Sequence, residues 1–143
     1  MGSGAALVIV VDGLIVIVIV LLVEVAARIK SCVREVDTVA RFGGDEFVVL
    51  LENISGDELD ASHKAGGVAE KIREALSQPY LLNDREYNSS PSIGISLYHG
   101  NDESMEALIK FADAAMYQAK DAGRNTVRFY DSEMQRNWEI SRG

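Results

Sequence analysis

The segment Arg41-Phe42-Gly43-Gly44-Asp45-Glu46-Phe47 lies between two short runs of residues that favour β-structure, Thr38–Ala40 and Phe47–Leu51. Two such runs joined by a short glycine-containing segment predict a β-hairpin. The paired glycines would let the backbone approach a bulky ligand closely, because no Cβ intervenes. The adjacent carboxylates are hard oxygen ligands that suit a Mg²⁺ ion holding phosphates. The same residues would also serve an ordinary turn with an exposed Glu46, so the hairpin alone leaves both interpretations open.

Size and composition predict one globular domain. The chain has 143 residues, of which 48% are hydrophobic and 25% charged, enough for a sizeable core. The net charge of −8 leaves no broad basic surface and argues against a nucleic-acid partner. Cys32 is the single cysteine, so no internal disulfide can form and a reducing, cytoplasmic location is expected. His63 and His99 lack the spacing of metal ligands.

The N-terminal region is unusually apolar. Residues 1–4 resemble an added leader outside the fold, and residues 5–23 contain a single charge, Asp12. In one interpretation Leu7–Val11 is a buried strand; in a second, Asp12-Gly13 is a turn and Leu14–Val20 a returning strand. A third is a membrane-spanning tether, followed by basic residues that would keep the remainder in the cytoplasm, although a central Asp costs about 2.5–3.5 kcal/mol on insertion. A non-native origin of this run is a further alternative.

Three amphipathic helices are predicted from apolar residues at three- and four-residue steps. They cover Leu21–Val33, His63–Ser77, which Pro79 ends, and Met105–Ala119. Asp102 or Ser104 would cap the third helix at its start, and Gly123 would follow its end.

The remaining segments predict strands and a tail. Tyr80–Leu82 and Arg85–Tyr87 would form a small hairpin, and Ser92–Tyr98 and Asn125–Tyr130 two further strands. Gly94 indicates close packing or a bulge. Residues 132–143 have weak helical character and are interpreted as an exit linker. Strands that alternate with helices predict an α/β or α+β domain in which helices cover a sheet.

Four patterns in register resemble one family. Gly43-Gly44-Asp45-Glu46-Phe47 is identified as the signature of the GGDEF family, whose active members are diguanylate cyclases. Arg34-x-x-Asp37, separated from Gly43 by five residues, resembles the family's inhibitory product-binding motif. Ser92–Ser96 and Ala112–Asn125 are similar to its penultimate strand and its closing motif. The resemblance extends from about Leu21 to about Asp131.

The resemblance implies a fold and a reaction. The fold is an α/β (α+β) sandwich related to nucleotidyl cyclases and polymerase palms, with a mainly antiparallel central sheet covered by helices. The reaction condenses two GTP into cyclic di-GMP with release of two pyrophosphates, in bacterial second-messenger signalling. Two domains would face each other as a homodimer with Mg²⁺ or Mn²⁺ as the cofactor. A neighbouring phosphodiesterase or sensor domain is an expected partner in the same protein.

The resemblance also assigns roles to individual residues. Gly43 and Gly44 would lie against the phosphates, while Asp45 and Glu46 would be the catalytic pair that holds or orients the metal. Lys120 and Arg124 would bind the β- and γ-phosphates of the nucleotide. Arg34 and Asp37 would bind the product, cyclic di-GMP, at the inhibitory site. Without the family, Lys120 and Arg124 would simply complement a helix dipole, and Arg34 and Asp37 would be a surface ion pair.

The N-terminal part of the family pattern is altered. The usual opening motif is absent, and only Val8–Asp12 resembles the metal-binding strand, with Asp12 as metal ligand or mere turn residue. Residues Leu14–Val20 are apolar where the family has polar residues that recognise guanine. Because a bidentate base contact is worth about 1–3 kcal/mol, we predict that this chain is a weak or inactive cyclase. The alternative is an impaired GGDEF module that binds cyclic di-GMP or GTP as a regulatory domain.

Overall fold

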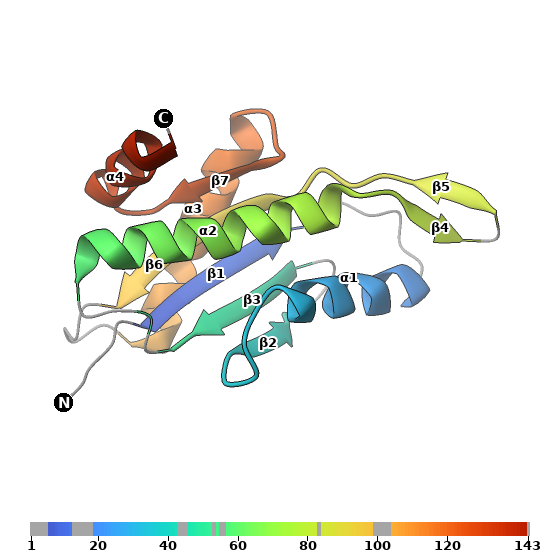
Figure 1. Cartoon of the computed structure of the whole chain (residues 1–143), viewed down its shortest axis with the longest axis horizontal. Helices are drawn as coiled ribbons and strands as arrows, with labels where there is room; N and C mark the ends of the chain where they lie inside the picture. The colour runs from blue at the N-terminus through green and yellow to red at the C-terminus, as the bar shows by residue number, and fades with distance from the viewer. Residues whose placement is uncertain are drawn as a thin grey trace.

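A five-stranded sheet in the order β2-β3-β1-β6-β7 forms the centre of the fold (Figure 1). The computed structural model describes residues 6–12, 19–42, 46–52, 54, 57–82, 84–98 and 104–142. The strands of this sheet are β1 (Ala6–Asp12), β2 (Thr38–Arg41), β3 (Glu46–Leu51), β6 (Ser92–Tyr98) and β7 (Thr126–Phe129). Among the described strands of this sheet only the β6–β7 pair is parallel, which confirms the predicted mainly antiparallel sheet.

Strand β1 resolves the interpretation of the apolar N-terminal run. It pairs along its length with β3 on one side and β6 on the other, so the prediction of a strand at Leu7–Val11 is confirmed, and this strand is central in the sheet. The predicted returning strand Leu14–Val20 is wrong at its end, because Ile19 and Val20 begin a helix; residues 13–18 lie outside the described residues. No helix within the described ranges has the length and apolarity needed to cross a membrane.

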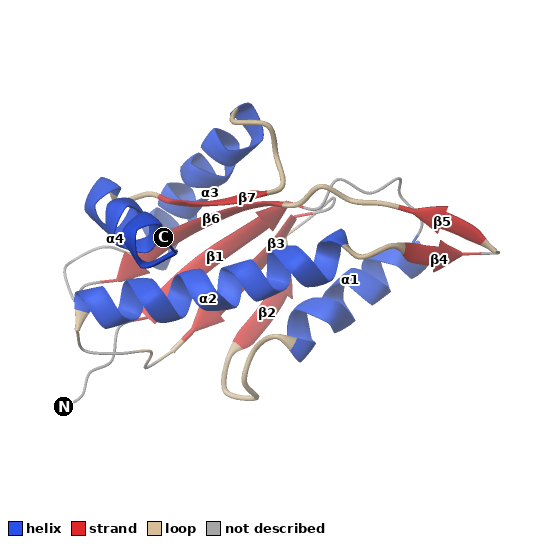
Figure 2. Cartoon of the chain, turned by 45° about the horizontal axis from the view of Figure 1, so that its top comes forward, coloured by secondary structure: helices blue, strands red, loops and turns tan. Residues whose placement is uncertain are grey.

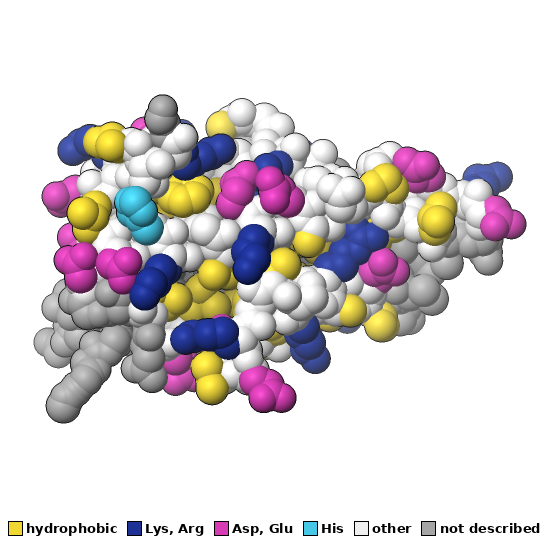
Figure 3. All heavy atoms as spheres, viewed as in Figure 1, with side chains coloured by type: hydrophobic (Ala, Val, Ile, Leu, Met, Phe, Trp, Pro, Cys, Tyr) yellow, Lys and Arg dark blue, Asp and Glu magenta, His cyan; other side chains and the backbone are white. Residues whose placement is uncertain are grey.

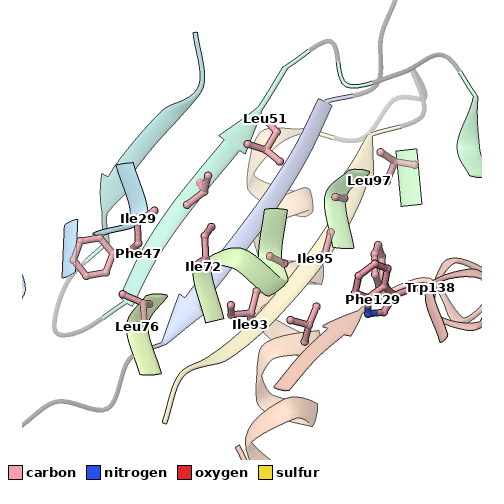
Figure 4. Packing of buried hydrophobic residues seen from close by; sticks show 14 of the residues in the cluster. Ile29, Phe47, Leu51, Ile72, Leu76, Ile93, Ile95, Leu97, Phe129 and Trp138 are labelled. Carbon is pink, nitrogen blue, oxygen red and sulfur yellow. The ribbon is translucent and has the colours of Figure 1, made fainter. Parts of the chain in front are cut away.

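Helices cover both faces of the sheet. Helices α1 (Ile19–Ser31) and α2 (Glu58–Ser77) lie on one face, and α3 (Met105–Asp121) lies on the other (Figure 2). Alternate residues of β3 serve the two faces: Phe47, Val49 and Leu51 belong to the core under α1 and α2, whereas Val48 packs with α3. Figure 4 shows the larger of these two cores, with Ile29 of α1 and Ile72 and Leu76 of α2 against the sheet.

Helix α3 lies very close to strand β6. A Cβ built on Gly94 would be 2.0 Å from the Ala112 carbonyl oxygen and 2.4 Å from the Met116 backbone nitrogen. This confirms the close packing predicted at Gly94. Of the two predicted N-terminal caps, Ser104 caps the helix, since its hydroxyl accepts a hydrogen bond from the Ala107 amide at 3.1 Å.

Helix α2 differs from its prediction in extent, whereas the predicted small hairpin agrees with the structure. Helix α2 begins at Glu58, five residues before the predicted His63, because the carboxylate of Asp57 caps it by accepting from the Asp60 amide at 3.1 Å. The predicted small hairpin is confirmed as β4 (Tyr80–Leu82) and β5 (Arg85–Tyr87), which project from the body as an arm (Figure 2).

The segment interpreted as an exit linker packs against the domain. Residues Ser132–Arg142 form helix α4, in which Met134 and Trp138 are buried in the larger core (Figure 4). Gly66 of α2 makes room for this contact, because a Cβ there would lie 2.3 Å from Cε3 of Trp138. The sequence suggested no role for Trp138, since its contact is formed with a residue 72 positions earlier.

Candidate functional site

The predicted hairpin is present as β2 and β3. Arg41 is the register partner of Phe47, and the Phe42 amide donates to the Glu46 carbonyl at 2.7 Å, so the strands are paired up to the base of the turn. The tip residues Gly43, Gly44 and Asp45 lie outside the described residues. Glu46 is the first described residue of the signature after these three.

Strand β1 brings Asp12 beside this hairpin. In the antiparallel pairing Asp12 is the register partner of Glu46, and on its other side it is the partner of Ser92. Directly opposite residues in such a pair have Cα atoms about 4.5–5.5 Å apart. Two acidic residues that are 34 positions apart in the sequence thus occupy adjacent positions at one end of the sheet.

The residue types at this end fit a hard divalent cation. Asp12 and Glu46 are in register, and Asp45 directly precedes Glu46 in the sequence. Carboxylate oxygens are the ligands that Mg²⁺ and Mn²⁺ prefer. The part of the chain that the structure describes contains no group of three or more His, Cys, Asp or Glu side chains arranged to hold a metal; Asp45 lies outside it.

The loop after α3 reaches the same end of the sheet. Thr126, the first residue of β7, is the register partner of Ser92, which is itself the partner of Asp12. Lys120 lies in the last turn of α3, and Arg124 in the loop that leads to β7. The backbone therefore brings the two predicted phosphate-binding residues to the end of the sheet that carries Asp12 and Glu46.

Arg124 has an unusual environment. Its Nη1 atom is buried and has no hydrogen-bond partner among the described residues. Since a buried donor on a charged group is costly to leave unsatisfied, this atom suits an anionic ligand. The Lys120 ammonium lies 5.1 Å from the centroid of the Tyr117 ring, an arrangement that favours a cation at the end of α3.

Arg34 and Asp37 form a closed pair at the opposite end of β2. The Asp37 carboxylate accepts hydrogen bonds from the backbone nitrogen, Nε and Nη2 of Arg34, at 2.8, 3.1 and 2.8 Å, and from the Glu52 amide at 3.4 Å. Nη2 of Arg34 also donates to the Glu52 carbonyl at 2.5 Å. The Asp37 side chain is 2% exposed and the Arg34 side chain 52% exposed, so the guanidinium is the part that a ligand can reach.

The contact between Arg34 and Asp37 shifts the pKa of both side chains. Burial by itself raises the pKa of the Asp37 carboxyl, but the hydrogen bonds from Arg34 and Glu52 and the Arg34 charge together lower this pKa below its usual value. The hydrogen bond to Asp37 raises the pKa of Arg34 above its usual value. Both shifts favour the ionised forms of the two side chains, which form an ion pair at 2.8 Å.

A cavity of 510 Å³ adjoins this pair. Arg34 and Asp37 lie at its wall together with Lys64 and Lys71 of α2, and the wall between them is mainly apolar, with Val33 and Val68. Figure 3 shows basic side chains gathered around an apolar depression on the face that carries α1 and α2. Sequence reasoning missed both lysines; their seven-residue separation, which places them on one helix face, was the available signal.

Comparison with a family model identifies the fold and the motifs. The model described as "Diguanylate cyclase, GGDEF domain" matches residues 20–126. This range contains the hairpin, the Arg34–Asp37 pair, and both Lys120 and Arg124.

Curated relatives from several bacteria are similar over most of this chain. A bifunctional diguanylate cyclase/cyclic di-GMP phosphodiesterase of Pseudomonas aeruginosa, MucR, is 48% identical over 117 residues, which are 82% of this chain and 16% of the relative. Diguanylate cyclase A of Treponema denticola is 41% identical over 109 residues, 76% of this chain and 28% of the relative. The chain thus spans less than a third of the length of these two relatives.

Solved structures share the same architecture. An EAL/GGDEF domain protein from M. capsulatus superposes with a TM-score of 0.76 at 33% identity, covering 90% of this chain and 86% of that one. The GGDEF domain of YfiN (TpbB) from Pseudomonas aeruginosa superposes with a TM-score of 0.77 at 32% identity, covering 90% and 83%. The predicted palm-like sandwich is therefore confirmed. By its motifs, its fold and these similarities, the chain belongs to the GGDEF domain family of diguanylate cyclases.

Proposed function

We propose that this chain is a cytoplasmic cyclase-type domain that binds GTP with Mg²⁺ and condenses two GTP into cyclic di-GMP. The observation that supports this proposal best is the register of β1, which sets Asp12 directly opposite Glu46. Asp12 is thereby favoured as a metal ligand over a mere turn residue, because it ends a central strand beside the signature hairpin.

Each residue at this end of the sheet has a role that its chemistry allows. Asp12, Asp45 and Glu46 would hold the Mg²⁺, which when bound lowers the pKa of a coordinated hydroxyl and neutralises charge on the phosphates. Gly43 and Gly44 would let the triphosphate lie close to the backbone, because they have no Cβ. Lys120 and Arg124 would neutralise and orient the β- and γ-phosphates, the part of GTP that leaves as pyrophosphate.

The reaction requires two copies of the domain. In each, the ribose 3′-hydroxyl gives up its proton to water as its oxygen forms a bond to the α-phosphorus of the GTP held by the other copy. The bond from that phosphorus to the oxygen that bridges the α- and β-phosphates breaks, and this oxygen leaves as part of pyrophosphate. A facing homodimer supplies this geometry. Because Leu14–Val20 offers no polar side chain for guanine, we expect weak GTP binding and slow turnover.

A turnover assay tests the proposal. The chain is incubated with GTP and Mg²⁺, and cyclic di-GMP and pyrophosphate are quantified by chromatography. We expect slow product formation that Glu46→Gln abolishes and Asp12→Asn reduces at least a hundredfold. Glu58→Gln, which alters an acidic residue at the start of α2, serves as the matched control and should retain the wild-type rate. Product formation that is undiminished by Asp12→Asn would refute the metal-ligand role of Asp12.

A second function is supported by the cavity beside Arg34. We infer that this cavity binds cyclic di-GMP, because 510 Å³ suits a ligand of that size class and Arg34, Lys64 and Lys71 supply positive charge for its two phosphates. Calorimetric titration with cyclic di-GMP should show binding that Arg34→Ala or Lys71→Ala weakens about tenfold or more. Lys30→Ala, on the exposed surface of α1, should leave it unchanged. Equal binding by Arg34→Ala would rule this site out.

If the domain lacks turnover but binds cyclic di-GMP, the regulatory role replaces the catalytic one. Such a module would pass the signal to a neighbouring domain of the whole protein. A phosphodiesterase domain is the favoured neighbour, because the name of the MucR relative includes both activities and this chain spans only 16% of its length.

A further inference from the structure

The loop that carries Arg124 has an unusual backbone. Gly123, Arg124 and Asn125 have φ values of +111°, +65° and +51°, so three consecutive residues lie in the left-handed region. Glycine adopts this region freely and Asn tolerates it, but for Arg it is sterically disfavoured. A conformation of this kind persists where the surrounding structure holds it.

Helix α2 holds this loop through a hydrogen bond to the side chain of Asn125. Nη1 of Arg73 donates a hydrogen bond to the Asn125 Oδ1 atom at 2.9 Å, across 52 positions of sequence. The Ser77 hydroxyl lies 3.1 Å from the same oxygen, but it also lies 2.7 Å from the Arg73 carbonyl oxygen, and its single proton serves one acceptor at a time. Arg73 is therefore the principal donor to Asn125.

Arg73 is itself held in a fixed orientation. Its Nε and Nη2 atoms donate to one carboxylate oxygen of Glu70, at 2.9 and 2.5 Å, which leaves Nη1 directed at Asn125. A planar guanidinium fixed on one side by a carboxylate presents its remaining donor in a defined direction. Because a guanidinium only donates, it also fixes which end of the Asn125 amide faces α2.

The backbone of the loop is anchored separately to α3. The Arg124 amide donates to the Ala119 carbonyl at 3.0 Å, and the Gly123 amide to the Lys120 carbonyl at 3.1 Å. These bonds continue the helix end and fix the start of the loop, whereas the bond from Arg73 fixes its far side, next to β7. Arg124 lies between the two anchors.

We propose that Arg73 is a positioning residue for Arg124: by holding the Asn125 amide, it keeps the loop in the left-handed conformation that brings the Arg124 guanidinium to the phosphate-binding end of the sheet. This inference rests on the proposed function, in which Arg124 binds the phosphates of GTP. It gives α2, which otherwise covers the core, a direct link to the nucleotide site.

A double-mutant cycle tests the proposal on GTP affinity. Binding of GTP with Mg²⁺ is measured calorimetrically for the full chain, Arg73→Met, Arg124→Ala and the double variant. Loss of one charge-assisted hydrogen bond corresponds to about ten- to a hundredfold weaker binding for Arg124→Ala. We expect at least threefold weaker binding for Arg73→Met and no additional loss when it is combined with Arg124→Ala. Arg136→Met, the same substitution at an exposed position of α4, should bind GTP as the unsubstituted chain does.

Asn125→Gly separates the amide contact from the backbone conformation. Glycine accepts a positive φ but has no side-chain oxygen for Arg73. We therefore expect this variant to weaken GTP binding as much as Arg73→Met, with no further loss in the combination of the two. A loss from Arg73→Met that persists at full size in the Arg124→Ala background would overturn the positioning role.

Hydrogen exchange tests the loop without any nucleotide. Exchange of the amides of residues 123–125 should be several-fold faster in Arg73→Met and unchanged in Arg136→Met, both compared with the unsubstituted chain. If the unsubstituted chain binds no GTP, the proposed function fails, and exchange alone then decides whether Arg73 holds the loop. Unchanged exchange in Arg73→Met would overturn the inference whatever the chain binds.

Discussion

Replacement of Gly94 by Ala tests the tightest contact between the sheet and helix α3. The new Cβ would lie 2.0 Å from the Ala112 carbonyl oxygen and 2.4 Å from the Met116 amide nitrogen. Both neighbours are backbone atoms of α3, so no side-chain rotation relieves the overlap. The whole helix must move away from β6, which separates the packed atoms around it.

The size of the effect follows from the costs of overpacking. Insertion of one methyl group into a packed core costs typically 1–3 kcal/mol, and a clash with backbone lies at the upper end of that range. We therefore expect Gly94→Ala to lower the free energy of unfolding by about 3 kcal/mol, on the order of a hundredfold in the folding equilibrium. With a urea m-value of about 1.5–2 kcal/mol/M, the unfolding midpoint should fall by about 1.5–2 M.

Gly67→Ala is the matched control for this measurement. Gly67 lies in the middle of α2, and a Cβ there would meet no atom within 4 Å. Alanine is the better helix former by about 0.8–1 kcal/mol, so this variant should be slightly more stable than the unsubstituted chain. Urea unfolding followed by circular dichroism compares the three proteins. A Gly94→Ala midpoint equal to that of the unsubstituted chain would refute the close approach of α3 to β6.

Three further predictions concern other contacts. Arg28→Met removes three hydrogen bonds of 2.8 Å to backbone carbonyls at the end of α2, and should lower the free energy of unfolding by about 2–4 kcal/mol in urea titrations; a loss below about 0.5 kcal/mol would contradict it. Gly66→Ala should displace Trp138, the single tryptophan, and shift its fluorescence to longer wavelength with a loss of about 1–3 kcal/mol; an unshifted spectrum would show that α4 does not pack on α2. Because its pKa in the folded state is lowered, ionised Asp37 stabilises the fold above about pH 4 and this contribution disappears as the pH falls through the lowered pKa. The stability difference between the unsubstituted chain and Asp37→Asn should therefore be constant from pH 7 to about pH 5 and shrink below pH 4 in urea titrations; a difference independent of pH down to pH 2 would contradict the pairing with Arg34.

Local patterns in the sequence were sufficient to predict most helices and strands of the fold. The hairpin, helices α1 and α3 and strand β6 follow from apolar periodicity, glycines and caps, which act over a few residues. The start of α2 was missed because Asp57 competes with other polar residues of the same loop as a cap. The motifs also identified the residues that the backbone later brings together. This was possible because the spacing of residues within a motif can be read from the sequence without knowledge of the tertiary structure.

The tertiary structure alone decided the contacts between distant segments. A strand, a turn and a membrane span were all compatible with the apolar run around Asp12, because an apolar sequence does not specify its partner; pairing with β3 and β6 made it the central strand. The packing of Trp138 on Gly66 and the bond from Arg73 to Asn125 likewise join residues far apart in sequence. The sequence by itself determined the chemistry available to this protein and its family, whereas the pairing of the strands decided that Asp12 and Glu46 stand next to each other.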